Sequence, residues 1–228
     1  MAKGLNMRFD LLSRRHLPLC LLIAMLLPMT GCVGFASHLM YWIKGNKQDA
    51  LCNALEGKRV AVVCVTGDRV EGIGISNEGE QLTFMVCSLL EKNGNKIHVI
   101  RPKEVSDWRD SNNWDEVDYR SIGRGVKADM VLAIDLSSFS LHDNSTLLRG
   151  KAGVKTTVYD MKDGGKTVFR DGPKEYAFPE HGGRHAVENE ANFHRVFVYM
   201  LAQDIAKSFY PYDRVEDVAQ EAAFLNQS

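Results

Sequence analysis

The fold follows first from the stretch Lys58-Arg-Val-Ala-Val-Val-Cys-Val65. It is a continuous, mostly β-branched run bounded by Gly57 and Gly67, and strands that are covered on both faces have unbroken apolar sequences of this kind. A second run, Met130-Val-Leu-Ala-Ile-Asp-Leu136, is the strongest strand signal in the chain. Together the two runs predict the centre of a sheet with helices on both faces.

Helical patterns separate these strands. Asn77 to Lys92 has apolar residues at helical spacing and stops at Asn93-Gly94, as helices commonly do. A short strand at 97–100, a helix from Pro102 to about residue 112 and a second short helix at 115–125 follow. Strands that alternate with helices predict right-handed crossovers and a parallel arrangement in the N-terminal half.

The pattern changes after residue 136. Residues 149–161 alternate, with Ala152, Val154, Thr156 and Val158 on one face, and the turn 163–165 leads into an antiparallel return at 167–170. Residues 173–184 are irregular and polar, and 188–209 form the longest expected helix. The prediction is an α/β fold whose mixed sheet is parallel in its N-terminal half and ends in an antiparallel C-terminal hairpin, with flanking helices.

The first 31 residues have the order of an export signal. Basic residues precede an apolar run from Leu17 to Leu27, and small residues lead to Cys32. The apolar run is about 11 residues long, whereas a helix that crosses a bilayer needs roughly 20. Ser13-Arg-Arg15 also fits a twin-arginine export start, so the export route stays open.

Thr30-Gly31-Cys32 resembles a lipobox, in which the cysteine is acylated and becomes the first residue of the mature chain. Met29 stands where that motif usually has leucine. An uncleaved helix that continues to Ile43 is the alternative, although Pro28, Gly31 and Gly34 interrupt it. We expect cleavage and lipidation at Cys32, and an anchor on the periplasmic face of a membrane, with the outer membrane slightly favoured.

The expected organisation is a signal peptide at 1–31, a lipid-anchored linker at 32–56, one α/β domain at 57–210 and an acidic C-terminal tail at 211–228. Removal of the signal leaves 24 basic and 28 acidic residues of the 28 and 29 in the whole chain. A mature chain with this balance has no strong basic field, so nucleic acid is not expected as a partner.

Three cysteines remain after the signal and Cys32 are set aside. An odd number argues against a complete set of disulfides. Cys64 and Cys87 lie in apolar surroundings and are expected to be buried as small apolar residues, whereas Cys52 lies in a more polar stretch.

The densest group of possible metal ligands is His181, His185 and His194. A zinc site needs three or four ligands held in defined geometry, and the first two histidines fall in a glycine-rich stretch. A solvated loop that leads into a helix is the preferred interpretation, and a metal or small-ligand receptor is the alternative. No cofactor is expected.

Other motifs that carry chemistry are incomplete. Gly72 and Gly74 follow the first strand, but the third glycine of a dinucleotide loop is replaced by Asn77. The sequence has no Gly-x-Ser-x-Gly elbow and no cysteine with an adjacent base. We therefore expect a protein that is not an enzyme.

Trp108 and Trp114 flank a cluster of acidic residues on two short helices. Two tryptophans this close can form a platform that binds a partner, but they more often anchor short helices by packing. Both interpretations are kept, with Trp108 and Trp114 as candidate partner-binding residues.

The order of elements resembles the domain shared by the N-terminal part of the Tol-system propeller protein TolB, the curli secretion lipoprotein and the lipoprotein activators of penicillin-binding proteins. The residues that carry this resemblance are 58–62, Ile122-Gly-Arg-Gly-Val-Lys-Ala-Asp129 and Val158-Tyr-Asp160. It covers roughly 57–210 and implies an architecture and an envelope setting.

Two further stretches, Trp108-Arg-Asp-Ser-Asn-Asn-Trp-Asp115 and Ser208-Phe-Tyr-Pro-Tyr-Asp213, look like those of uncharacterised lipoproteins of planctomycete-type bacteria. This second resemblance implies localisation and no activity. The sequence therefore predicts a lipid-anchored envelope protein that binds another protein as an adaptor or assembly factor.

Overall fold

A computed structural model describes residues 47–67, 77–112, 114, 118–145, 147–180, 182, 184–185, 190–216 and 219. Its helices are α3 (Asn77–Asn93), α4 (Pro102–Ser111), α5 (Tyr119–Gly125) and α6 (Glu190–Lys207). Its strands are β1 (Lys47–Gln48), β2 (Arg59–Thr66), β3 (His98–Val99), β4 (Met130–Asn144), β5 (Leu147–Asp160), β6 (Lys166–Phe178), β7 (Arg184–His185) and β8 (Tyr212–Asp213).

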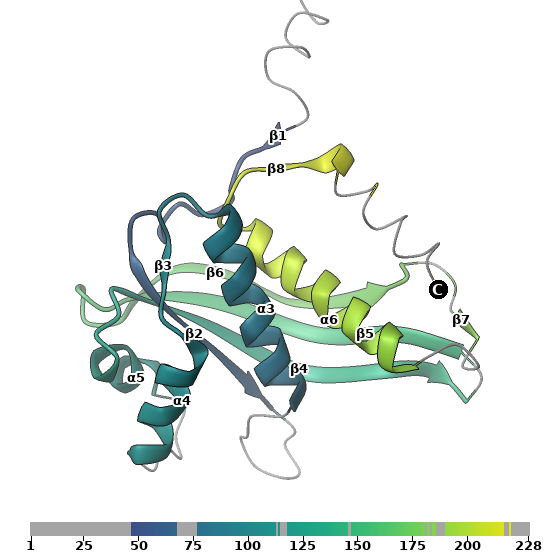
Figure 1. The fold of residues 1–228 in the computed structure, drawn as a ribbon, viewed down its shortest axis with the longest axis horizontal. Helices are drawn as coiled ribbons and strands as arrows, with labels where there is room; N and C mark the ends of the chain where they lie inside the picture. Colours follow the sequence, from purple (N-terminus) through teal and green to yellow (C-terminus); the bar gives the residue numbers. More distant parts are fainter. Residues whose placement is uncertain are drawn as a thin grey trace, which may run out of the picture. The chain divides into compact units, whose positions relative to one another are not determined.

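The main sheet has the strand order β3-β2-β4-β5-β6, and β7 pairs with Leu147 and Leu148 at the start of β5 (Figure 1). The strand β2 is parallel to both β3 and β4, whereas β4, β5 and β6 pair antiparallel. The predicted mixed α/β fold, parallel first and antiparallel after, is confirmed.

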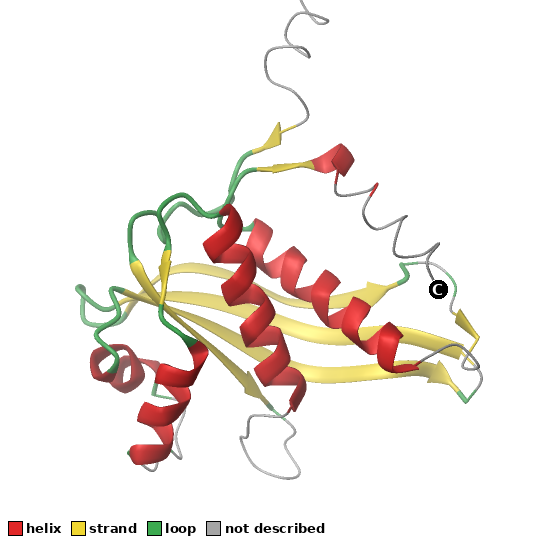
Figure 2. Ribbon diagram, viewed as in Figure 1, coloured by secondary structure: helices red, strands yellow, loops and turns green. Residues whose placement is uncertain are grey.

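Two hydrophobic clusters lie on opposite faces of this sheet. Alternate residues of β2 divide between them, because successive side chains of a strand point to opposite faces. Val60, Val62 and Cys64 pack in the cluster under α3 and α6, while Val63 and Val65 pack with α4 and α5. Figure 2 shows α3 and α6 side by side over one face, with α4 and α5 at the end of the sheet near β3.

The start of β2 is tied to its surroundings by polar contacts. The Arg59 amide donates to the Asp129 carboxylate at 2.9 Å, and the Arg59 guanidinium contacts Glu104 on α4 at 3.1 Å. A further bond from this guanidinium reaches the Val126 carbonyl at 3.4 Å. These contacts link the amino end of β2 to α4 and to the segment that follows α5.

The predicted extent of the last strand is wrong. It was expected to end near residue 170, but β6 continues to Phe178, past Pro173. Pro173 is accommodated at a bulge, since Val154 pairs with Lys174 and Thr156 with Asp171, which leaves one extra residue on β6. A proline in a sheet is tolerated on an edge strand or at a bulge because its missing N–H breaks no ladder there.

The glycine that ends α5 does not have a left-handed backbone conformation. Gly125 is the last residue of α5, and the residue with positive φ is Lys127, at 55°. Gly125 is required for another reason, because a methyl group there would overlap the indole ring of Trp108. The glycine therefore allows the close packing of α4 against α5.

Ordered elements also lie on both sides of the expected domain bounds. Lys47 and Gln48 pair with Asp213 and Tyr212, and Leu55 is fully buried. None of the described helices is both long enough and apolar enough to cross a membrane.

Candidate functional site

One concave feature of the described residues is a groove between α3 and α4, at the side of β2. It encloses about 280 Å³, near the lower end of the roughly 300–1,000 Å³ of typical ligand sites. Its floor is Val62, Val63 and Cys64. Its walls are Glu80, Thr83 and Phe84 from α3 and Pro102, Lys103, Val105, Ser106 and Arg109 from α4. We call this the α3–α4 groove.

The floor of the groove is a sheet edge. The strand β3 pairs with only Arg59 and Val60, and beyond Val60 no strand among the described elements continues on that side. The other side of β2 is paired with β4 along its length. The carboxyl half of β2 therefore pairs with β4 on one side and with no described strand on the other.

The hydrogen bonds at the start of β2 show which residues point toward this edge. The Val60 carbonyl accepts from the Ile100 amide at 2.8 Å, on the β3 side, whereas the Arg59 carbonyl accepts from the Asp129 amide at 2.8 Å, on the β4 side. In a parallel ladder this alternation continues along the strand. The N–H and C=O groups of Val62 and Cys64 consequently point into the α3–α4 groove.

The α3 wall carries an exposed aromatic ring. The inward side of α3 holds Leu82, Val86, Cys87, Leu89 and Leu90, and Phe84 lies off that stripe with 65% of its surface exposed. Glu80 lies one turn earlier on the same wall. A large exposed aromatic at a groove rim is typical of residues that bind a partner.

The α4 wall is cationic. Lys103 is paired with Asp107 one turn along the helix at 3.0 Å and its side chain is 83% exposed. Arg109 lies 3.6 Å from Asp110 and its side chain is mostly covered. The groove therefore has a carboxylate on one wall and two cations on the other.

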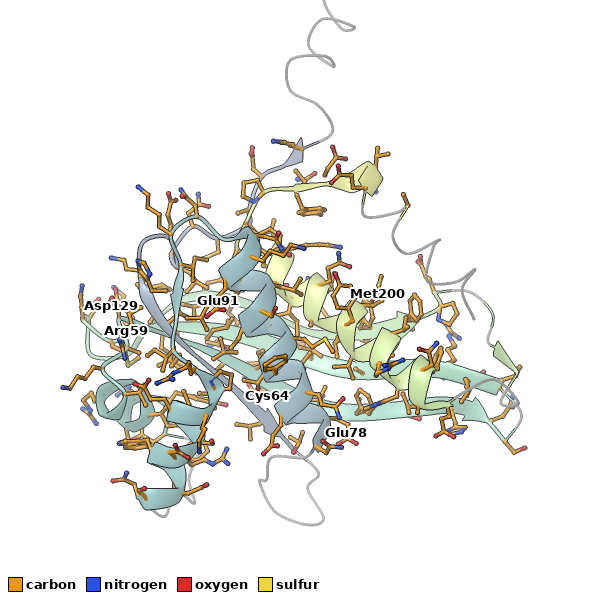
Figure 3. The ribbon with its side chains drawn as sticks, viewed as in Figure 1. Arg59, Cys64, Glu78, Glu91, Asp129 and Met200 are labelled. Carbon is orange, nitrogen blue, oxygen red and sulfur yellow. The ribbon has the colours of Figure 1, made fainter. Side chains whose placement is uncertain are left out.

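The thiol on the floor is not positioned for chemistry. Burial raises the pKa of Cys64 to about 12, with a smaller contribution from the Asp135 charge. Because the thiolate is the reactive form, a thiol that stays protonated at neutral pH is a poor nucleophile. The groove is better suited to binding than to thiol catalysis. Figure 3 labels Cys64 on β2, beside α3.

The two candidate tryptophans lie away from the floor of the groove. Trp108 and Trp114 are partly buried against the α4–α5 cluster. The indole N–H of Trp114 is buried without a hydrogen-bond partner in the described part of the chain. Each tryptophan thus contributes to packing under the two short helices.

The structure describes two of the three candidate histidines, and they lie on different elements. His194 lies on α6, where its ring packs edge-on against Phe139, and His185 lies in β7 opposite Leu147. His181 lies outside the described residues, as do Cys32, Gly72 and Gly74. Within the ranges that the structure describes, no three histidine, cysteine or carboxylate side chains come together as a metal site would need.

The three described cysteines follow the expected pattern. Cys64 and Cys87 are buried and unpaired, and Cys52 is half-buried. Burial raises the pKa of Cys87 to about 12 as well, with Glu91 adding to the shift.

The residues of the α3–α4 groove were not identified from the sequence, although two signals were present. Phe84 is an aromatic residue outside the apolar spacing of its helix. The strand at 97–100 is also only half as long as the strand at 58–65 beside it, and it is closed by Pro102. The difference in length indicates an unpaired edge once the two strands are known to be neighbours.

No protein-family model matches the sequence, and no curated protein is similar to it. Solved structures with a similar arrangement include the PelC dodecamer from Paraburkholderia phytofirmans, at 13% identity and a TM-score of 0.39, over 72% of this chain and 95% of that one.

Two others are the lipoprotein GNA1162 from Neisseria meningitidis and the LpoB C-terminal domain from Salmonella enterica. The first has 13% identity and a TM-score of 0.43 over 66% of this chain and 99% of that one. The second has 18% identity and a TM-score of 0.34 over 54% and 84%. A lipoprotein is thus among the similar structures, while the resemblances to TolB and to planctomycete lipoproteins stay predictions. The function proposed below is argued from this chain's own residues.

Proposed function

We propose that this chain is a lipid-anchored protein of the cell envelope that binds another protein through the α3–α4 groove and catalyses no reaction. The observation that carries the proposal is Phe84, an aromatic ring exposed at the rim of a groove whose floor is a strand edge that no described strand pairs with. Exposed aromatic residues beside a recessed apolar floor are characteristic of binding sites for proteins.

The anchor is the second part of the proposal. Cys32 carries the lipid, and Val33-Gly34 after it lacks the aspartate that retains lipoproteins in the inner membrane of enteric bacteria. Several acyl chains on one residue give stable membrane attachment, which a single chain does not. A lipidated Cys32 would hold the α/β domain at the surface of the membrane, on its periplasmic face.

Binding through the groove is tested by site-specific photo-crosslinking in the native host. A photoreactive phenylalanine analogue replaces Phe84 in one strain and Val168 in another, since Val168 is an exposed apolar residue on β6. We expect one discrete protein adduct from position 84 that is absent from position 168. Equal adducts from both positions, or none from position 84, would contradict a binding site in the groove.

The anchor is tested separately with a Cys32→Ala variant. We expect the wild-type chain to fractionate with membranes and to incorporate radiolabelled palmitate, and the variant to do neither. A Cys32→Ala chain that still fractionated with membranes after losing its leader would contradict the lipid anchor and leave the groove experiment unaffected.

A further inference from the structure

We propose that a basic pocket beside β1 and β8 binds the phosphate of an anionic lipid headgroup, so that this end of the domain docks onto the membrane surface. The site rests on the lipid anchor of the proposed function and gives the domain a second contact with the bilayer. Its residues are separate from those of the α3–α4 groove.

The pocket lies where the last turns of α3 and α6 meet the two-stranded ribbon of β1 and β8 (Figure 1). We call it the ribbon pocket. It encloses about 490 Å³, within the roughly 300–1,000 Å³ of typical ligand sites. Its lysines come from three elements, which are β1 for Lys47, the last turn of α3 for Lys92 and the last turn of α6 for Lys207. The fold therefore brings three distant cations to one pocket.

The ribbon pocket has more cations than anions. Its charged lining residues are Lys47, Lys92, Lys207, Asp213 and Glu216. None of the ion pairs among the described residues involves Lys47 or Lys92, although Asp213 is the direct cross-strand partner of Lys47. Both lysines are exposed. Their ammonium groups are thus accessible to an anion from outside the chain, even though the chain has a formal net charge of −1.

Complementation of the helix ends accounts for only part of this arrangement. A lysine in the last turn of a helix offsets the partial negative charge of that helix end. This explains Lys92 and Lys207, which lie in the last turns of α3 and α6. It does not explain Lys47, because Lys47 lies on a strand. An external anion would be the common partner of all three.

The other lining residues suit a phosphate group. Lysine binds phosphate as a point charge, and the hydroxyl of tyrosine can donate a hydrogen bond to a phosphate oxygen. The Lys207 ammonium lies 5.3 Å from the centre of the Tyr212 ring, and Tyr199 and Tyr210 also line the pocket. A group with several acceptor oxygens matches this set of donors.

The place of the ribbon pocket along the chain indicates the source of the phosphate. Lys47 lies 15 residues after Cys32, and a chain of that length spans at most about 50 Å. A lipid at Cys32 therefore keeps the headgroups of the bilayer within reach of β1. Leu51 and Val215, which closely follow β1 and β8, are 67% and 56% exposed. Exposed apolar residues near lysine and tyrosine are typical of segments at a membrane interface.

Lysine footprinting tests the headgroup site on the full-length chain. The chain is bound to vesicles of phosphatidylcholine, or of phosphatidylcholine and phosphatidylglycerol in equal parts, and the acetylation rate of each lysine is measured by mass spectrometry. We expect phosphatidylglycerol to slow acetylation of Lys47 and Lys92 about fivefold, which is the effect of an anionic membrane on a lysine at its surface. Lys127 and Lys166, exposed elsewhere on the domain, should change little. Equal slowing at all four lysines, or none at Lys47 and Lys92, would overturn the site.

Two matched variants separate a localised site from general surface charge. In Lys47→Gln/Lys92→Gln, phosphatidylglycerol should no longer protect Lys207, because two of the three ammonium groups around the phosphate are gone. In Lys127→Gln/Lys166→Gln, which has the same change in charge, the protection of Lys207 should persist. Both variants should have the circular dichroism of the wild-type chain. Equal loss of protection in the two variants would contradict the ribbon pocket.

Soluble glycerol phosphate distinguishes a lipid headgroup from a free phosphate ester. In a non-ionic detergent it should slow acetylation of Lys47 and Lys92 only at a far higher phosphate concentration than the vesicles require. If it acts at the same concentration, the ligand is a free phosphate ester and the lipid assignment is wrong.

The anchor and the headgroup site can fail independently. A chain that incorporates no palmitate, but whose Lys47 and Lys92 are protected by phosphatidylglycerol, would refute the proposed anchor and support the headgroup site. A palmitoylated chain in which neither lysine is protected would support the anchor and overturn the headgroup site.

Discussion

Replacing Phe84 with serine tests whether this side chain serves binding or packing. Phe197 is the matched control, because it is fully buried in the main cluster. Its ring lies 5.2 Å from that of Phe139 and 6.0 Å from that of Tyr176. Both residues are helical phenylalanines, so the comparison holds the side chain and the secondary structure constant while burial differs.

The structure sets the expected magnitudes. Full burial of a phenylalanine stabilises a protein by about 1.5–3 kcal/mol, and Phe84 is 65% exposed. About a third of that value, roughly 0.5–1 kcal/mol, is therefore the expected loss for Phe84→Ser, since serine and phenylalanine have similar helix propensities. Truncation of a buried ring costs about 3–5 kcal/mol, and a loss of at least that size is expected for the matched Phe197→Ser change, which also buries a hydroxyl.

The assay is urea unfolding of the full-length chain, followed by circular dichroism at equal detergent concentration. A Phe84→Ser variant with near wild-type stability and no co-purified partner would support the groove. A loss of more than about 2 kcal/mol for Phe84→Ser would contradict a binding role for this residue, because the ring would then belong to the packing of α3.

Three further predictions concern the domain itself. The Asp129 pKa is lowered by the Arg59 amide and by Lys162, so this carboxylate stabilises the fold above the unfolded pKa of about 3.9, and the contribution is lost as pH falls through the folded pKa. Asp129→Asn should therefore weaken the decrease in the free energy of unfolding between pH 5 and pH 2. An unchanged decrease would contradict the role of this carboxylate. A Gly125→Ala change should cost about 1–3 kcal/mol in urea unfolding through overlap with Trp108, whereas an unaltered midpoint would show that the two helices are loosely packed. The Cys64 thiol, with its pKa raised to about 12, should react with a thiol reagent at pH 8 only at the rate of unfolding, and rapid labelling in the native state would contradict its burial.

The two central strands could be predicted because a strand buried on both faces has a continuous apolar sequence, which is recognisable without knowledge of the neighbouring strands. The runs at 58–65 and 130–136 are apolar throughout, and the structure pairs them residue by residue from Val60–Met130 to Thr66–Leu136. The helix at 77–92 was equally clear, since Leu82, Val86 and Leu90 recur at helical spacing and all three are buried. In both cases local pattern and tertiary burial agree.

The long hairpin could be predicted only in part. Beyond residue 170 the sequence of β6 contains Gly172, Pro173 and several charges, which are features of a loop when strand partners are unknown. As an edge strand, β6 tolerates the proline at a bulge, and Gly172 has a φ of 94° that suits glycine. The strand is specified by its pairing with β5, which is a long-range contact.

The α3–α4 groove could not be predicted because it depends on β3 being too short to pair with the carboxyl half of β2. The sequence indicates a strand at 97–100 and a proline at 102, but it does not show that this strand pairs with only the first residues of β2. Phe84, Lys103 and Arg109 come from two helices, and only the fold brings them to one groove. The alternating bonds of Arg59 and Val60 then decide which backbone groups face it.

An unpaired strand edge is a hazard as well as a binding site, because it can pair with any other exposed strand. Here α3 lies over one face of β2 and α4 over the other, and Glu80, Lys103 and Arg109 lie at the rim. This covering leaves Val62 and Cys64 only about 1% exposed. The edge is therefore shielded from pairing with other exposed strands.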